Sequence, residues 1–135
     1  MIYRFEVIGK PQGKGRPRLG RYGSTYTPTK TRNYEELVKW SFRNKYKKVS
    51  PSEKEINVTI VAIFEPPQSI SKKKRNFLIS NEVGHTHKPD CDNIIKIILD
   101  SLNKIVYKDD NQVTKVICRK QYGPENKVLV EIAEV

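Results

Sequence analysis

Long hydrophobic segments, closely spaced cysteines and an excess of acidic residues are all absent from this 135-residue chain. No uninterrupted apolar run reaches the roughly 20 residues that a membrane-spanning helix requires. The first residues lack the hydrophobic region of a secretory signal peptide, so we expect a cytoplasmic protein. The two cysteines, Cys91 and Cys118, form neither a Cys-x-x-Cys pair nor another metal-ligand spacing, and we expect reduced thiols.

Positive charge is what the sequence has in excess, and it is unevenly distributed. The chain carries 26 lysine and arginine residues against 15 aspartate and glutamate residues, a formal net charge of +11. Half of the basic residues, but only three of the acidic ones, fall within residues 1–48. Such a concentration of cations is typical of proteins that bind polyanions, most often nucleic acids. The alternative is a soluble basic protein without a polyanionic partner.

Two segments are candidates for contacts with DNA phosphates. Residues 10–30 form a loop whose glycines let the backbone approach a ligand and whose arginines can bind phosphate oxygens. Its glycines do not follow a strand in the order of a nucleotide-binding loop, which excludes that function. The second segment is the basic run of residues 72–75. The alternative is a flexible loop for the first segment and a solvated run of charges for the second. The candidate DNA-binding residues are Lys14, Arg16, Arg18, Lys72, Lys73, Lys74 and Arg75.

The order of strand and helix patterns predicts a single domain over residues 1–135 with a mixed α/β (α+β) fold. Helices should pack against one mixed sheet. Residues 112–123 and 126–135 alternate as two strands around a Gly-Pro-Glu-Asn turn, which predicts a closing hairpin. Two earlier strands are predicted at residues 2–9 and 55–65, the second apolar enough to be central. The predicted helices are residues 31–47, a short helix capped by Ser69 or Ser71, and residues 93–103.

Each of the two longer helices has a recognisable apolar face. In the first, the stripe is Tyr34, Leu37, Val38 and Phe42. The single tryptophan, Trp40, is also expected in the core, with stacking on a nucleic-acid base as the alternative. In the second, the core face is Ile94, Ile95, Ile98, Leu99 and Leu102. The opposite stripe of this helix is polar and consists of Asn93, Lys96, Asp100 and Asn103.

Four acidic residues at the two ends of this second helix are the candidate catalytic groups. Asp90 and Asp92 precede the helix, where an extended chain after Pro89 would direct both carboxylates to one side. Asp109 and Asp110 follow it, in a loop that we expect to fold back over the helix start. Lys96, four residues after Asp92, can reach this cluster.

Converging carboxylates beside a lysine suit the chemistry of a phosphodiester. Mg²⁺ prefers hard oxygen ligands and retains water, which can serve as the nucleophile. The lysine can stabilise charge that develops on a phosphate oxygen. The structural alternatives are an N-cap at Asp92, a surface ion pair at Asp90, and a turn at residues 108–111. Together, in a chain built to bind polyanions, the acidic residues indicate a metal site, since they would otherwise repel the ligand.

The segment KPDCDNIIKIILDSLNKIVYKDDNQV, residues 88–113, closely resembles the core motif of the RusA-type Holliday junction resolvases, small nucleases of bacteria and their prophages. The shared pattern is Asp-x-Asp-Asn, a lysine four residues after the second aspartate, Asp-Ser-Leu-Asn, and Asp-Asp-x-Gln-Val. The segments GKGRPR, YTPTKTRNYE and PPQSISKKKR also resemble those of phage-type members, so the resemblance covers most of the chain.

The resemblance implies a mixed α/β homodimer that cuts four-way DNA junctions by paired incisions, with its activity near the nucleoid. It implies that Asp90, Asp92 and Asp110 are catalytic carboxylates that bind Mg²⁺, for which Mn²⁺ can substitute. Lys96 is implied to be the catalytic lysine. Asp109 stands beside the third carboxylate without a defined role. The segment HTHKPD departs from the arginines or other polar residues of some members, which leaves the role of His85 and His87 open.

Two other functions remain consistent with the residues alone. The first is a different metal-dependent nuclease that acts on flaps, nicks or duplex ends. The Pro89–Asp90 pair fits restriction-type nucleases, but their (Asp/Glu)-x-Lys partner is missing at a convincing spacing. The second is a non-catalytic nucleic-acid-binding module, in which the acidic residues would serve only as a helix cap and a turn.

Overall fold

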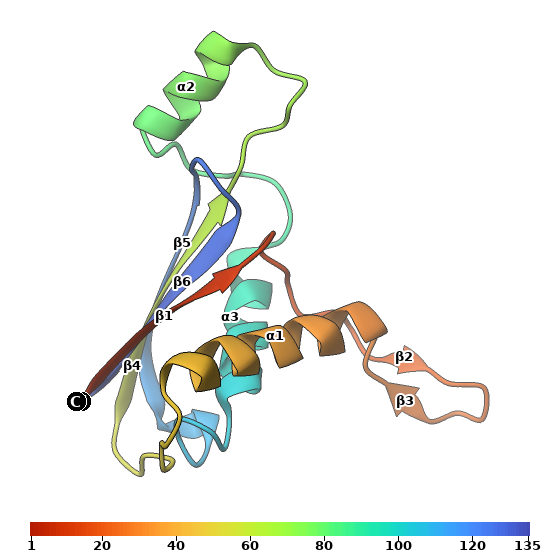
Figure 1. Cartoon of the computed structure of the whole chain (residues 1–135). Helices are drawn as coiled ribbons and strands as arrows, with labels where there is room; N and C mark the ends of the chain where they lie inside the picture. The colour runs from red at the N-terminus through yellow and green to blue at the C-terminus, as the bar shows by residue number, and fades with distance from the viewer.

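A computed structural model describes all residues of the chain, 1–135. It is an α+β fold with three α-helices, a four-stranded mixed sheet and a separate two-stranded ribbon (Figure 1). In chain order the elements are β1 (Ile2–Ile8), β2 (Arg18–Leu19), β3 (Thr25–Tyr26), α1 (Thr29–Lys45), β4 (Ile56–Phe64), α2 (Lys72–Ser80), α3 (Cys91–Leu102), the 3₁₀ helix η1 (Asp110–Gln112), β5 (Val113–Tyr122) and β6 (Lys127–Glu134). The predicted mixed α/β class is therefore correct. No helix of this fold has the length and apolar character needed to cross a membrane.

The strands of the main sheet lie in the order β1-β6-β4-β5. β4 is central, as predicted, and is parallel to β5 and antiparallel to β6. The predicted hairpin between residues 112–123 and 126–135 is wrong, because β4 lies between the two strands. β4 is the most apolar strand, and the central position lets both of its edges form hydrogen bonds away from water.

The Gly-Pro-Glu-Asn turn crosses the end of β4 instead of joining two adjacent strands. The Gly123 N–H donates to the Phe64 carbonyl oxygen at 3.0 Å, and the Asn126 side chain accepts from the Glu65 N–H at 2.7 Å. A Cβ atom at position 123 would collide with the Ile63 side chain, so glycine is needed for this close crossing. The sequence indicated the turn, but it did not indicate that β4 would lie beneath it.

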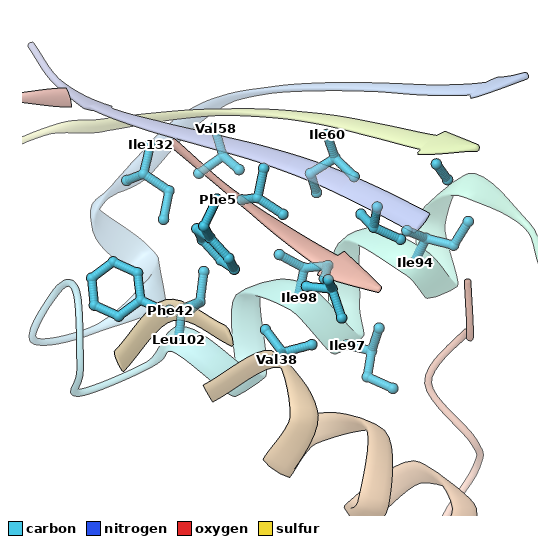
Figure 2. Close-up of a cluster of buried hydrophobic side chains, with 14 of the residues drawn as sticks. Phe5, Val38, Phe42, Val58, Ile60, Ile94, Ile97, Ile98, Leu102 and Ile132 are labelled. Carbon is cyan, nitrogen blue, oxygen red and sulfur yellow. The ribbon is translucent and has the colours of Figure 1, made fainter. Parts of the chain in front are cut away.

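α1 and α3 cover one face of the sheet and bury a single continuous core between them and the strands (Figures 1 and 2). The α1 stripe is confirmed, since Tyr34, Val38 and Phe42 are buried and Leu37 is half-buried. The expectation for Trp40 is wrong, because its side chain is 62% exposed. Only one face of helix α1 packs against the rest of the protein, and Trp40 lies outside that face.

The buried face of α3 is rotated slightly from the one predicted. Ile94, Ile98 and Leu102 are fully buried as expected, and Ile97 joins them. Ile95 and Leu99 are only half-buried and pack at the border of the core. α3 packs against both α1 and the sheet (Figure 2), so its apolar side faces both neighbours.

α2 stands beyond the end of the sheet and buries none of its residues (Figure 1). Ser71 caps it, as one of the two predicted serines, by accepting from the Lys74 N–H at 3.2 Å. Its position leaves most of its basic side chains in solvent.

Candidate active site

The first acidic pair lies at the start of α3. Asp90 is the extended N-cap residue and Asp92 is in the first helical turn. The helix begins at Cys91, two residues earlier than predicted, so the extended segment ends at Asp90 and does not continue through Asp92. Neither carboxylate caps the helix, and neither forms a hydrogen bond or an ion pair within the chain. Both side chains are exposed, which leaves their oxygens free to bind a ligand.

Lys96 follows Asp92 by one helical turn and is also exposed. The predicted contact between its ammonium group and the acidic residues is not formed, because Lys96 has no ion pair within the chain. Asp92, Lys96 and Asp100 nevertheless recur at four-residue spacing, which places them along one stripe of α3. The lysine therefore lies between two acidic positions on the exposed side of the helix.

The second acidic group lies beside the later turns of α3. Asp110 begins η1 and lies close to Asp109 and Asp100. Contact with the Asp109 carboxyl is the largest cause of a raised pKa at Asp110, followed by partial burial and by the negative charges of Asp109 and Asp100. Negative groups that raise one another's affinity for protons are also suited to binding a cation.

Asp109 has a structural role that accounts for its carboxylate. It caps η1 by accepting from the Asn111 N–H at 3.1 Å, and its own N–H donates to Gln112 Oε1 at 2.9 Å. Gln112 in turn donates to the carbonyl oxygens of Ser52 and Lys54. The turn expected as an alternative at residues 108–111 is therefore present, but it uses Asp109 and not Asp110.

The loop that carries Asp110 is held away from the start of α3. Tyr107 is fully buried, and its hydroxyl donates to the Leu99 carbonyl oxygen at 2.6 Å. The expectation that this loop folds back over the helix start is therefore wrong. No three acidic, histidine or cysteine side chains are grouped closely enough to hold a metal ion among themselves. Asp92 and Asp100 are separated by about 12 Å along the helix axis at ~1.5 Å per residue.

Lys14 connects the N-terminal loop to this region. Its ammonium group is 2.8 Å from Glu35 Oε2 and 3.2 Å from Asp100 Oδ2. The backbone N–H of Lys14 donates to the Asn93 carbonyl oxygen. Partial burial lowers the pKa of Lys14, but the hydrogen bonds to Glu35 and Asp100 outweigh it, and the pKa is raised. The sequence suggested a phosphate contact at Lys14; the structure gives this group two protein carboxylates.

The arginines of the same loop remain available. Arg16 and Arg18 are exposed and line a cleft of about 360 Å³ together with Lys30, which the sequence analysis missed. β2 and β3 form a small ribbon that projects from the body of the protein beside α1 (Figure 1). The flexible loop considered as an alternative is thus partly ordered, and its cations lie at the α1 N-terminus.

The basic run on α2 is divided in the same way. Lys72, Lys73 and Lys74 are exposed. Arg75 instead pairs with Glu65 at 2.8 Å and donates to the Pro66 carbonyl oxygen at 3.0 Å, which fastens α2 to the end of β4. Three of these four cations are therefore free for a polyanion.

The two histidines lie just before the first acidic pair. The His85 ring stacks on Phe64, with centroids 3.7 Å apart and planes 8° apart. Burial, followed by the positive charge of Lys120, lowers the pKa of His85 to about 4. His87 is exposed. Lys120, another residue that sequence reasoning missed, donates to the carbonyl oxygens of His87 and Pro89 at 2.5 and 2.7 Å and so positions the segment leading into Asp90.

Comparisons with known proteins agree with the motif on α3. Residues 9–133 match the family described as Endodeoxyribonuclease RusA. The chain is also 32% identical over 136 residues to the uncharacterized protein YqaN of Bacillus subtilis (strain 168), a match that covers 98% of this chain and 96% of YqaN. With nearly its whole length matched and the acidic motif at the exposed start of α3, the chain belongs to the RusA family of Holliday junction-resolving endodeoxyribonucleases.

Proposed function

We propose that this chain, as one nuclease domain over residues 1–135, resolves four-way DNA junctions by metal-dependent paired incisions. It would act as a cytoplasmic homodimer, near the nucleoid, in DNA recombination and repair. The observation that carries the proposal is the pair Asp90 and Asp92, two exposed carboxylates without any partner in the chain. In a protein with a net charge of +11, such groups oppose DNA binding unless a cation lies between them and the phosphates.

Asp90, Asp92 and Asp110 are the residues that would hold Mg²⁺ or Mn²⁺. Their hard oxygen donors fit these ions, and the raised pKa of Asp110 marks a position where negative charge is uncompensated. When bound, the ion supplies Lewis acidity and an activated water. Because Asp110 lies beside Asp100 in the free chain, joint binding requires η1 and the start of α3 to approach one another.

The remaining roles belong to the cations. The Lys96 ammonium group, exposed on the same stripe as Asp92, would contact a phosphate oxygen at the scissile position and stabilise its charge. Arg16, Arg18, Lys72, Lys73 and Lys74 would hold flanking phosphates, which positions the duplex arms without reading their sequence. We leave Lys14 and Arg75 out of the proposed set, because each already pairs with a protein carboxylate; their predicted phosphate contacts stay predictions.

The direct test is incubation of the protein with a synthetic four-way junction, a flap and a linear duplex of the same sequence, each with and without Mg²⁺. Junction resolution should require Mg²⁺ and should exceed cleavage of the other two substrates. Preferred cutting of the flap would instead identify a different structure-specific nuclease.

A Mg²⁺ titration by calorimetry separates a nuclease from a DNA-binding module that lacks catalysis. The wild-type chain should bind the ion, and binding should weaken in Asp90→Asn and Asp92→Asn. A chain that binds junctions but shows no carboxylate-dependent binding of Mg²⁺ would be a binding module only.

A further inference from the structure

The two cysteines of the chain, which are 27 residues apart in sequence, meet where α3 packs against β5. Cys91 Sγ lies 3.9 Å from the Cys118 carbonyl oxygen, and the Cys91 thiol is near enough to contribute to the shifted pKa of Cys118. Both are free thiols in this structure. Their spacing in the sequence gave no sign of this contact.

The two thiols differ in accessibility. Cys91 is exposed as the first residue of α3, whereas Cys118 is half-buried on β5 at the border of the core. Burial, and next the Cys91 thiol beside it, raises the pKa of Cys118 to about 12. The raised pKa disfavours Cys118 as the first nucleophile, so the exposed Cys91 would react first and Cys118, which lies behind it, would resolve the product.

The position of Cys91 connects this pair to the acidic residues. Cys91 stands between Asp90 and Asp92, two of the three carboxylates of the proposed metal site. The sulfur atoms of a disulfide are about 2.05 Å apart. Forming that bond would draw the first residue of α3 toward β5 and displace the carboxylates on either side of it.

We propose that Cys91 and Cys118 form a reversible intramolecular disulfide that switches off DNA cleavage. The Cys91 thiolate attacks a low-molecular-weight disulfide, forms a mixed disulfide and releases one small thiol. The Cys118 thiol then loses its proton, attacks the Cys91 sulfur and releases the second small thiol. The two cysteines thus lose two protons and two electrons, and the small disulfide is reduced to two thiols.

Bond formation stands on the cysteine geometry alone, whereas its effect on cleavage rests on the proposed function. The first experiment therefore measures only chemistry. Reduced protein is treated with oxidised glutathione, quenched in acid, and examined by intact mass and peptide mapping. The wild-type chain should lose two hydrogen masses, retain no glutathione, and yield a peptide that joins Cys91 to Cys118.

Single variants are the matched controls. Cys118→Ser should stop at the mixed disulfide and keep one glutathione on Cys91. Cys91→Ser should react at least tenfold more slowly, since its remaining thiol is half-buried. A wild-type chain that keeps glutathione on Cys91, or that forms only disulfide-linked dimers, would overturn the intramolecular bond.

The second experiment measures consequence. Oxidised wild-type protein should cleave junctions at least tenfold more slowly than reduced protein, and dithiothreitol should restore the rate. Cys118→Ser should match reduced wild type under reducing conditions. Full cleavage by protein whose disulfide is complete would overturn the switch. If neither state cleaves any junction, the proposed function fails, and Mg²⁺ affinity of the two states then decides whether the bond displaces the carboxylates.

Discussion

Among the acidic residues, Asp109 and Asp110 are neighbours with different tasks. Asp109 uses its carboxylate to cap η1, whereas Asp110 has a raised pKa through contact with Asp109 and the charge of Asp100. Asp90 and Asp92 have no partner in the chain at all. The same side chain thus occurs as a structural group and as a candidate ligand within one motif.

Neutralising the proposed ligands should separate binding from catalysis. Asp90→Asn, Asp92→Asn and Asp110→Asn should each reduce junction cleavage by about 10²-fold or more while junction binding persists, because each removes an anion from beside the phosphates. Asp109→Asn is the control, because it removes the same charge at the neighbouring position and keeps an oxygen that can cap η1, so cleavage should persist. Single-turnover cleavage and gel-shift assays measure the two properties. If any of the first three variants cleaves at the wild-type rate, the residue that it replaces is not a metal ligand.

Lys96 should contribute to the reaction more than to affinity. Lys96→Ala should slow cleavage by about 10²-fold, in line with the loss of one charge-stabilising contact in a transition state. Lys115→Ala, which removes an exposed lysine from β5, should leave the rate unchanged. The comparison is made at saturating protein. A defect of Lys96→Ala that disappears at saturation would make this lysine a phosphate anchor.

His85 should make the fold less stable in acid. Its pKa is about 4 in the folded chain and about 6.5 when unfolded, so the unfolded state binds the proton more readily between these values. The stability from neutral His85 is complete above pH 6.5 and is lost as the pH falls toward 4. Urea unfolding of wild type should show this loss, and His85→Phe, which keeps a ring on Phe64, should show less of it. A His85 ring that titrates near pH 6.5 by NMR would contradict this expectation.

At the scale of elements, the cations of the N-terminal loop fall into two groups, those paired within the chain and those available to a ligand. Lys14 fastens it to α1 and α3, while Arg16 and Arg18 extend from it into solvent beside Lys30. Paired cations hold the loop in place, and the unpaired ones face outward from it. Arg75 and its three lysine neighbours repeat this division on α2.

Variants of this loop should therefore behave differently. Replacing Arg16 and Arg18 with glutamine should reduce the salt dependence of duplex binding by about two phosphate contacts, at ~0.9 each. Lys14→Gln should leave that slope unchanged but lower the free energy of unfolding by about 2 kcal/mol, because its charged hydrogen bonds are lost. Anisotropy titrations over a salt series and urea unfolding test the pair. A reduced slope in Lys14→Gln would restore its proposed phosphate contact.

At the scale of the whole molecule, one chain has a single proposed active site, whereas the proposed substrate has two equivalent strands to cut. An open four-way junction has approximate two-fold symmetry, and its resolution requires cuts in two strands. One set of the proposed residues Asp90, Asp92, Asp110 and Lys96 would serve one strand. A symmetric pair of chains is the simplest way to supply the second set, since two-fold dimers are the commonest soluble oligomers.

Mixed dimers test this symmetry. Dimers of one wild-type chain and one Asp92→Asn chain should nick a single strand of a junction and leave the partner strand intact. A supercoiled cruciform plasmid gives the readout, because one cut yields a nicked circle and paired cuts yield a linear product. Wild-type dimers should give linear product under the same conditions. Linear product from isolated mixed dimers, or a monomer bound to the junction, would contradict paired sites.

Local properties were determined by the sequence itself. The apolar stripe of α1, the central position of β4, the Ser71 cap and the acidic motif all depend on residues a few positions apart, whose spacing fixes which sides of an element are apolar and where it starts. The family followed from the same motif. The role of each site residue stays a prediction.

What only the tertiary structure decided depends on residues distant in sequence. A strand pattern does not say which strands lie beside it, so the sequence could predict that β4 is central but not that its neighbours are β5 and β6. An apolar stripe does not say how far its cover extends, which is why Trp40 was misplaced. The same reason applies to Lys14 with Asp100 and to Cys91 against Cys118. Each contact forms because the packing of the sheet and helices brings the two side chains together. Nothing in the local sequence around either residue indicates its partner.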